Sequence, residues 1–151
     1  MTLKIIHTVI HLISAVCIIV ALIAVVDQHN RAKLPNMYSL HSWAGIASIA
    51  MFFVQIIIGT VAFLTPIVPV YFKAYLMPIH RFVGTANFAM AVVAIISGIT
   101  EKLIFMGAAE YGRLPSYAVM GNFLGITVIL YSVGVAILVI YPDFKRVEKN
   151  K

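Results

Sequence analysis

The chain has 151 residues, of which 62% are hydrophobic and 11% charged, and its net charge is +6 at pH 7. Because an ordinary soluble domain has about 45–50% apolar and about 25% charged residues, this composition argues against a water-soluble globular protein. The eleven Lys and Arg residues are scattered between apolar segments and form no basic run, which argues against nucleic acid as a partner. We expect one small domain embedded in the lipid bilayer.

Four apolar segments are long enough to cross the hydrocarbon core as helices, which takes about 20 residues each. In chain order they are residues 5–26, 41–64, 80–105 and 117–141. The short connections between them contain Pro or Gly, which end helices. The expected fold is therefore all-α, an antiparallel four-helix membrane bundle over residues 1–151. The side that holds both termini carries more Lys and Arg, which predicts cytoplasmic termini by the positive-inside rule.

The histidines are the residues that point most clearly to a cofactor-binding or catalytic role. His7 and His11 fall in the first segment, His41 begins the second, His80 begins the third, and His29 lies in an expected connection. Ionisable side chains inside a membrane span are costly and point to function. The first and third helices run in the same direction, so His7 and His80, each near a helix start, are expected at one depth. Two such imidazoles can supply both axial ligands of a haem between bundle helices.

Alternatives to that pair remain open. His11 lies one turn deeper than His7 on the same helical face and is the other candidate ligand. A single histidine in an apolar helix is more often a hydrogen-bonded packing residue, and zinc is less favoured because no Cys or acidic residue lies nearby. The chain lacks a C-x-x-C-H attachment motif, so a bound haem is expected to be non-covalent haem b. His41 has no partner at its own depth in a matching helix.

Several short sequence motifs resemble those of the cytochrome b561 family of ascorbate-dependent transmembrane oxidoreductases. They are Lys4-Ile-Ile-His7-Thr-Val-Ile-His11, Asp27-Gln-His29, Tyr38-Ser-Leu-His41-Ser-Trp-Ala-Gly45, Gln55 with Gly59, Pro78-Ile-His80 with Gly84, and Gly98-Ile-Thr-Glu101-Lys102. The resemblance covers nearly the whole chain. Family members have six helices and two haems, and this chain is similar to the last four helices.

The resemblance implies that His7 and His80 are the iron ligands of the cytoplasmic-side haem b. It implies that His41 binds the outer haem together with a histidine from a helix that has no counterpart in this sequence. We therefore expect a fragment or shortened product of a six-helix protein, with a four-helix member holding one haem as the alternative. His29 or a second copy of the chain, as a homodimer, are the candidates to complete the outer site.

The function implied by the resemblance is transmembrane electron transfer. Cytoplasmic ascorbate gives electrons, through haem b, to monodehydroascorbate or a ferric chelate across a plasma membrane or endomembrane vesicle. Lys4 and Lys73, the latter expected in the loop before His80, are candidates to bind ascorbate, and each is also explained as a headgroup-facing lysine. The candidates for acceptor binding are His29, Asn36, Tyr38 and Ser39, which also fit an ordinary loop surface. The alternative function is a membrane subunit without enzymatic activity that binds haem structurally or not at all.

Overall fold

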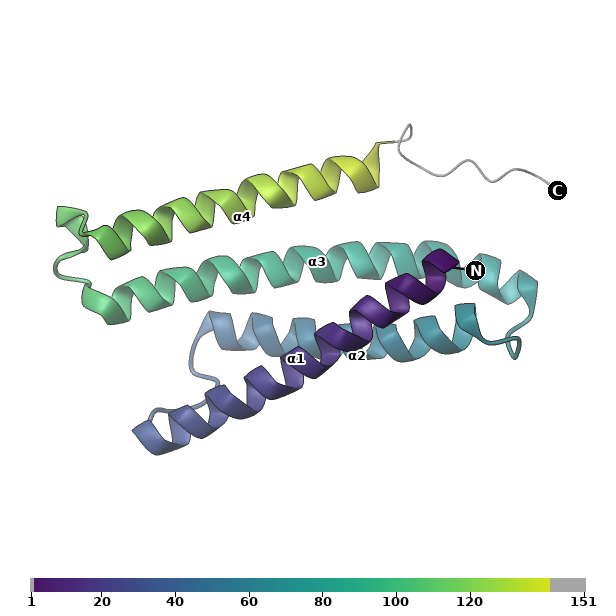
Figure 1. The fold of residues 1–151 in the computed structure, drawn as a ribbon, viewed down its shortest axis with the longest axis horizontal. Helices are drawn as coiled ribbons and strands as arrows, with labels where there is room; N and C mark the ends of the chain where they lie inside the picture. The colour runs from purple at the N-terminus through teal and green to yellow at the C-terminus, as the bar shows by residue number, and fades with distance from the viewer. Residues whose placement is uncertain (1, 142–151) are drawn as a thin grey trace. The chain divides into compact units, whose positions relative to one another are not determined.

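The computed structural model describes residues 2–141, and almost all of them are helical (Figure 1). Four long helices follow one another, α1 (Thr2–Ala32), α2 (Leu40–Leu64), α3 (Val70–Gly107) and α4 (Ser116–Ile140), with a short 3₁₀ helix η1 (Tyr111–Arg113) before α4. No strand occurs between residues 2 and 141. Each of the four long helices is long and apolar enough to cross a membrane. The all-α membrane architecture predicted from the sequence is confirmed.

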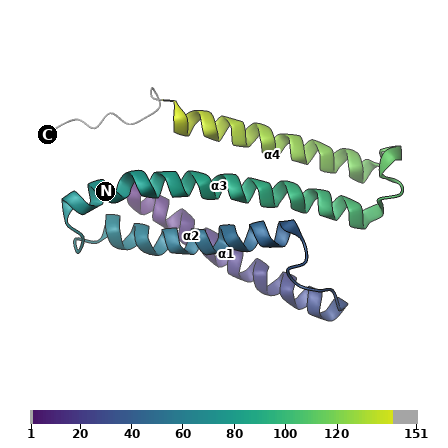
Figure 2. The same cartoon turned by 180° about the vertical axis from the view of Figure 1, so that it is seen from behind.

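The chain divides into two compact units, Met1–Ala94 and Ile95–Lys151. In the first unit α1 crosses α2 obliquely, and the first part of α3 runs antiparallel beside α2, as Figures 1 and 2 both show. In the second unit α4 turns back against the last turns of α3, where Gly121 meets the side chain of Leu103. Neighbouring helices within each unit are thus antiparallel.

Small side chains form the interior, and large apolar ones lie outside. The buried residues are Ala15, Ala44, Ser48, Ala62 and Ala94 in the first unit, and Leu103 and Ala118 in the second. Large aliphatic residues such as Ile23, which is 65% exposed, cover the outer surface. Small residues between helices allow close backbone approach, and lipid chains solvate the apolar exterior. This distribution is the one that a bilayer requires.

Helix α1 is longer than predicted at its C-terminal end. The prediction ended the helix at residue 26, where hydropathy falls, and placed His29 in a loop, but His29 lies in the last turn of α1. An ion pair between Asp27 and Arg31 (2.9 Å) supports the extra turns, since residues four apart face each other on a helix. The helix ends in a Schellman motif, with Lys33 at a φ of 55° and the Leu34 N–H donating to the His29 carbonyl. Loss of hydropathy marked the end of the apolar span and not the end of the helix.

Helix α3 begins at Val70, so the prediction that His80 opens this helix was wrong. The backbone N–H groups of Phe72 and Lys73 donate to the Pro69 carbonyl and start the helix there. Pro78 lies inside α3, and a proline in a membrane helix is tolerated because neighbouring groups satisfy the freed carbonyl. The prediction began the helix at residue 80 and so left Pro78 in the connection before it. His80 is therefore a residue of the helix interior, and Lys73 belongs to the first turn of α3 and not to a loop.

Candidate functional site

His7 and His11 of α1 lie side by side, and His11 contacts α2. The rings of His7 and His11 have centroids 4.2 Å apart and meet edge to face, as expected for residues four apart on one helical face. The His11 ring also packs edge to face on Phe52 of α2, at 5.5 Å. Contact with α2 thus positions the His11 imidazole, and His7 packs on His11.

His80 of α3 faces α2 in the same region. Its ring packs against Phe63 with centroids 5.3 Å apart and lies against Gly59, where an added Cβ would be 3.1 Å from the His80 Cε1 atom. His7 and His11 both lie within electrostatic range of His80. Helices α1 and α3 therefore bring three imidazoles together at one region of the first unit, including the two that the sequence analysis paired.

The donor set at this region suits a haem iron. The Nδ1 atom of His80 is buried and has no hydrogen-bond partner among residues 2–141. This atom therefore does not make the hydrogen bond expected of an ordinary packing histidine. Imidazole nitrogen is an established axial ligand of haem. Gly59 leaves room beside the ring, because any side chain there would press on Cε1. The residues present fit the group that the sequence predicted.

His41 has a different and more defined environment. Its Nδ1 atom lies 2.8 Å from the backbone carbonyl oxygen of Ala94 in α3. A carbonyl oxygen only accepts, so Nδ1 carries the proton and donates, which leaves the Nε2 lone pair available for a metal. A hydrogen bond of this kind is the usual partner of a metal-binding histidine. The unprotonated Nε2 is the state of the ring that the iron ligation predicted for His41 requires.

The predicted acceptor-binding residues lie around the connection between α1 and α2. Ser39 is the N-cap of α2 and its side chain accepts from the Ser42 N–H, which is a structural role typical of serine at this position. The Asn36 amide donates to the Asn30 side chain at 3.1 Å. Tyr38 is exposed. Only exposed or partly exposed side chains are found here, and both Ser39 and Asn36 stabilise the local backbone.

The two predicted ascorbate-binding lysines differ. Lys4 is exposed in the first turns of α1. The Lys73 ammonium donates to the carbonyl oxygen of Thr65 at 2.8 Å, just after the end of α2. A cation at this place satisfies a helix C-terminal carbonyl and interacts well with the helix dipole. Lys73 therefore has a structural function irrespective of any substrate.

Sequence reasoning missed two polar features of α2. Ser48 donates to the side-chain oxygen of Asn87 at 2.9 Å, a hydrogen bond between the two helices. The Oε1 atom of Gln55 is buried and lacks a hydrogen-bond partner within the described residues. The signal for both in the sequence is a polar side chain in an otherwise apolar helix.

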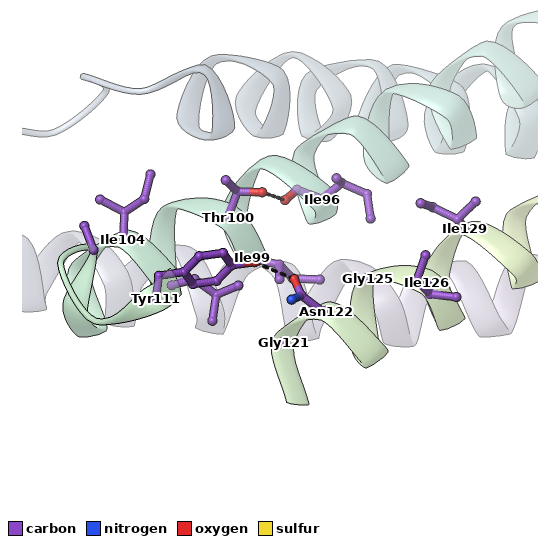
Figure 3. Close-up of a pocket in the computed structure, with 12 residues that line it drawn as sticks. Ile96, Ile99, Thr100, Ile104, Tyr111, Gly121, Asn122, Gly125, Ile126 and Ile129 are labelled. Atoms are coloured by element: carbon purple, nitrogen blue, oxygen red, sulfur yellow. Dashed lines mark hydrogen bonds between the residues drawn. The ribbon is translucent and has the colours of Figure 1, made fainter. Parts of the chain in front are cut away.

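The second unit contains an apolar hollow of about 470 Å³ between the end of α3 and α4 (Figure 3). Isoleucines such as Ile99 and Ile126 line it together with Gly121 and Gly125. At one side the Tyr111 hydroxyl donates to the Asn122 side chain at 2.7 Å. None of the predicted site residues is among its described lining. The hollow is separate from the histidines.

Comparison with known proteins identifies the family. A sequence model described as eukaryotic cytochrome b561 matches residues 1–106. The chain belongs to the cytochrome b561 family. This result confirms the resemblance on which the site predictions depend.

Relatives of this cytochrome b561 chain are named as reductases. The chain is 37% identical over 145 residues to a lysosomal membrane ascorbate-dependent ferrireductase of Bos taurus, covering 94% of this chain and 55% of that protein. It is 38% identical over 144 residues to a plasma membrane ascorbate-dependent reductase of Xenopus laevis, covering 95% and 51%. It is 36% identical over 148 residues to the lysosomal ferrireductase of Homo sapiens, covering 96% and 61%. The chain thus spans about half the length of the curated relatives it matches.

Proposed function

We propose that this chain takes part in electron transfer across a membrane from ascorbate to monodehydroascorbate or ferric iron, using haem b. The observation that carries the proposal is the convergence of His7 and His80, from two helices, at one region of the first unit. The names of the relatives, which are ascorbate-dependent reductases of lysosomal and plasma membranes, support the reaction and the type of membrane.

In this proposal the chain's own residues hold the haem and orient the substrate. His7 and His80 would hold one haem by its iron, with His11 packed beside His7. When bound, the haem accepts and releases single electrons. Lys4, exposed three residues before His7, attracts the ascorbate anion through a charge-assisted hydrogen bond. The termini are cytoplasmic, so this haem lies on the side where ascorbate is supplied.

His41 is the proposed ligand of a second haem at the opposite side. Its support is the hydrogen bond from Nδ1 to Ala94, which leaves Nε2 free to bind iron. The other axial ligand would come from His29 or from another chain, including a second copy of this one. We propose that His29, Asn36, Tyr38 and Ser39 contact the electron acceptor at that side.

The visible absorption spectrum of the purified chain, expressed with ample haem, tests the proposal. We expect reduced b-type bands that develop on addition of ascorbate and are lost in His80→Ala and His7→Ala. His29→Ala, a histidine of the last turn of α1, is the matched control and retains the bands of the His7 and His80 site. Absence of haem absorbance in the unaltered chain would favour the alternative of a membrane subunit without enzymatic activity. Loss of the bands in His11→Ala but not in His7→Ala would assign the ligand to His11.

A further inference from the structure

The apolar hollow between the end of α3 and α4 has no task in the proposed function. Its volume is about 470 Å³, and protein interiors keep few voids larger than a water molecule. Apolar side chains around an empty space lose the dispersion contacts that a filled space would give them. An engineered apolar cavity of only about 150 Å³ stays dry and takes up benzene. The hollow therefore suits an apolar occupant.

The polar side chains at the hollow are already paired. The Thr100 hydroxyl donates to the Ile96 carbonyl oxygen at 3.0 Å. The Tyr111 hydroxyl donates to Oδ1 of Asn122 at 2.7 Å (Figure 3). This second bond uses the amide oxygen of Asn122 and leaves the two Nδ2 hydrogens of this exposed residue to donate to an acceptor. A hydrocarbon chain with an acceptor oxygen at one end matches these features.

The polar end of the hollow lies beside the ends of its two helices. Helix α3 ends at Gly107 and α4 begins at Ser116, and the connection between them carries Glu110 and Arg113. Charged side chains are costly in hydrocarbon, so this connection belongs at the membrane surface. Tyr111 of the same connection lines the hollow. The hollow therefore runs inward from the level of the lipid headgroups.

The length of the hollow distinguishes an acyl chain from a helix as its occupant. Its lining extends from Ile96 to Ile104 on α3 and from Gly121 to Ile129 on α4, which is about 12 Å along each helix at 1.5 Å per residue. The hydrocarbon core is about 30 Å thick, so one leaflet is about 15 Å deep. A partner helix would pack along the whole span, whereas an acyl chain occupies one leaflet.

We propose that the hollow binds one acyl chain of a membrane phospholipid from the leaflet at which the α3–α4 connection lies. The acyl chain packs between isoleucines of the two helices and beside Gly125, where an added Cβ meets no described atom within 4 Å. The Nδ2 group of Asn122 donates to the ester carbonyl oxygen at the head of the acyl chain. The bound lipid thereby fills the space between α3 and α4, and the site does not depend on haem.

Photo-crosslinking in vesicles tests the site. The full chain is placed in phosphatidylcholine that carries a diazirine on one acyl chain, and the labelled residues are mapped by mass spectrometry. Ile126 lines the hollow and is 57% exposed, whereas Leu124, outside its described lining, is 51% exposed. Bulk lipid should label both residues about equally, so we expect a bound acyl chain to label Ile126 more strongly. Equal labelling in the unaltered chain would overturn the inference without any variant.

Variants that fill the hollow should remove this preference. Gly125→Leu adds bulk from α4 and Ile99→Phe adds it from α3, and each should lower the labelling of Ile126 to that of Leu124. Gly134→Leu is the matched control, because it makes the same change on α4 outside the described lining, where an added Cβ also meets no described atom within 4 Å. A preference that survives both filling variants, or that is lost equally in Gly134→Leu, would overturn the inference.

The composition of the vesicles separates a phospholipid from other occupants. Cholesterol added to the phosphatidylcholine should leave the preference for Ile126 unchanged, and loss of the preference would assign the hollow to a sterol instead. The preference should also be the same at high and low ratios of protein to lipid. If it increased as the protein was diluted, the hollow would be a contact between copies of this chain, and the inference would fail.

Discussion

The Nδ1 atom of His41 lies 2.8 Å from the carbonyl oxygen of Ala94, which ties the start of α2 to α3. The contact determines which ring nitrogen of His41 is protonated. It leaves the Nε2 lone pair of His41 unprotonated, which is the state that the proposed iron ligation requires.

A count of haem per chain tests how many sites are complete. We expect a pyridine haemochrome assay of the 151-residue chain to give about one haem, because His7 and His80 are the proposed pair of axial ligands that the chain itself supplies. His41→Ala should then leave the count at about one, and His80→Ala should abolish it. A count of two that fell to one in His41→Ala would show that His41 has found a second ligand.

Gly59 is predicted to be sensitive to substitution because of His80. An added Cβ would stand 3.1 Å from the ring Cε1, so Gly59→Ala forces the imidazole to shift and Gly59→Val forces it further. We expect haem content to fall in the order glycine, alanine, valine, measured by the reduced spectrum of equal amounts of protein.

Gly45 of the same helix provides the control, because an added Cβ there meets no described atom within 4 Å. Gly45→Ala should retain the haem content of the unaltered chain. Full haem content in Gly59→Val would show that the ring has room to move and would contradict the constraint.

Substitution of Lys4 is predicted to weaken ascorbate binding, and substitution of Lys73 is predicted to lower stability. Lys4→Ala should raise the KM for ascorbate and leave thermal stability unchanged, because its exposed side chain supplies only charge. Lys73→Ala should lower stability, by about 0.5–1.5 kcal/mol for one hydrogen bond, because its ammonium donates to the Thr65 carbonyl. Steady-state reduction with varied ascorbate and thermal unfolding in detergent measure the two effects. A KM change in Lys73→Ala at unaltered stability would reverse the assignment.

In the second unit, Gly121 is predicted to be indispensable for packing of α4 on α3. A Cβ at Gly121 would stand 2.7 Å from a methyl carbon of Leu103, and Leu103 is buried. Overpacking of this kind typically destabilises by about 1–3 kcal/mol. Gly121→Ala should lower the unfolding temperature, and the loss should be smaller in a Leu103→Ala background. Gly125→Ala, with open space around it, is the control, and additive effects of Gly121→Ala and Leu103→Ala would exclude the contact as the cause.

The fold was predictable in kind because the bilayer fixes the length of an apolar helix. Its helix ends were not, for reasons visible at two places. Asp27 and Arg31 continue α1 into water as an ion-paired turn, which hydropathy does not detect. Pro78 lies within α3, where a rule learned from soluble helices predicts a break.

The residues of the proposed site can be named from the sequence, but their geometry cannot. The sequence paired His7 with His80 because both were expected at helix starts, yet His80 lies in the interior of α3. The structure brings the two rings near each other through the crossing of α1 over α2 instead. Roles that depend on where one particular atom lies, such as the capping function of Lys73 and the unpaired oxygen of Gln55, had no signal in the spacing of residues.

Helix α3 carries both His80 and the carbonyl of Ala94. This one helix therefore sets the distance between the two proposed metal positions. At 1.5 Å per residue, His80 and Ala94 are about 21 Å apart along α3. Between them, the hydrogen bond from Ser48 to Asn87 holds α3 against α2. Any sliding of α3 along its axis would disturb His80 at Gly59 and His41 at Ala94 together. The spacing of the two proposed iron positions therefore cannot be changed at one end of α3 without affecting the other.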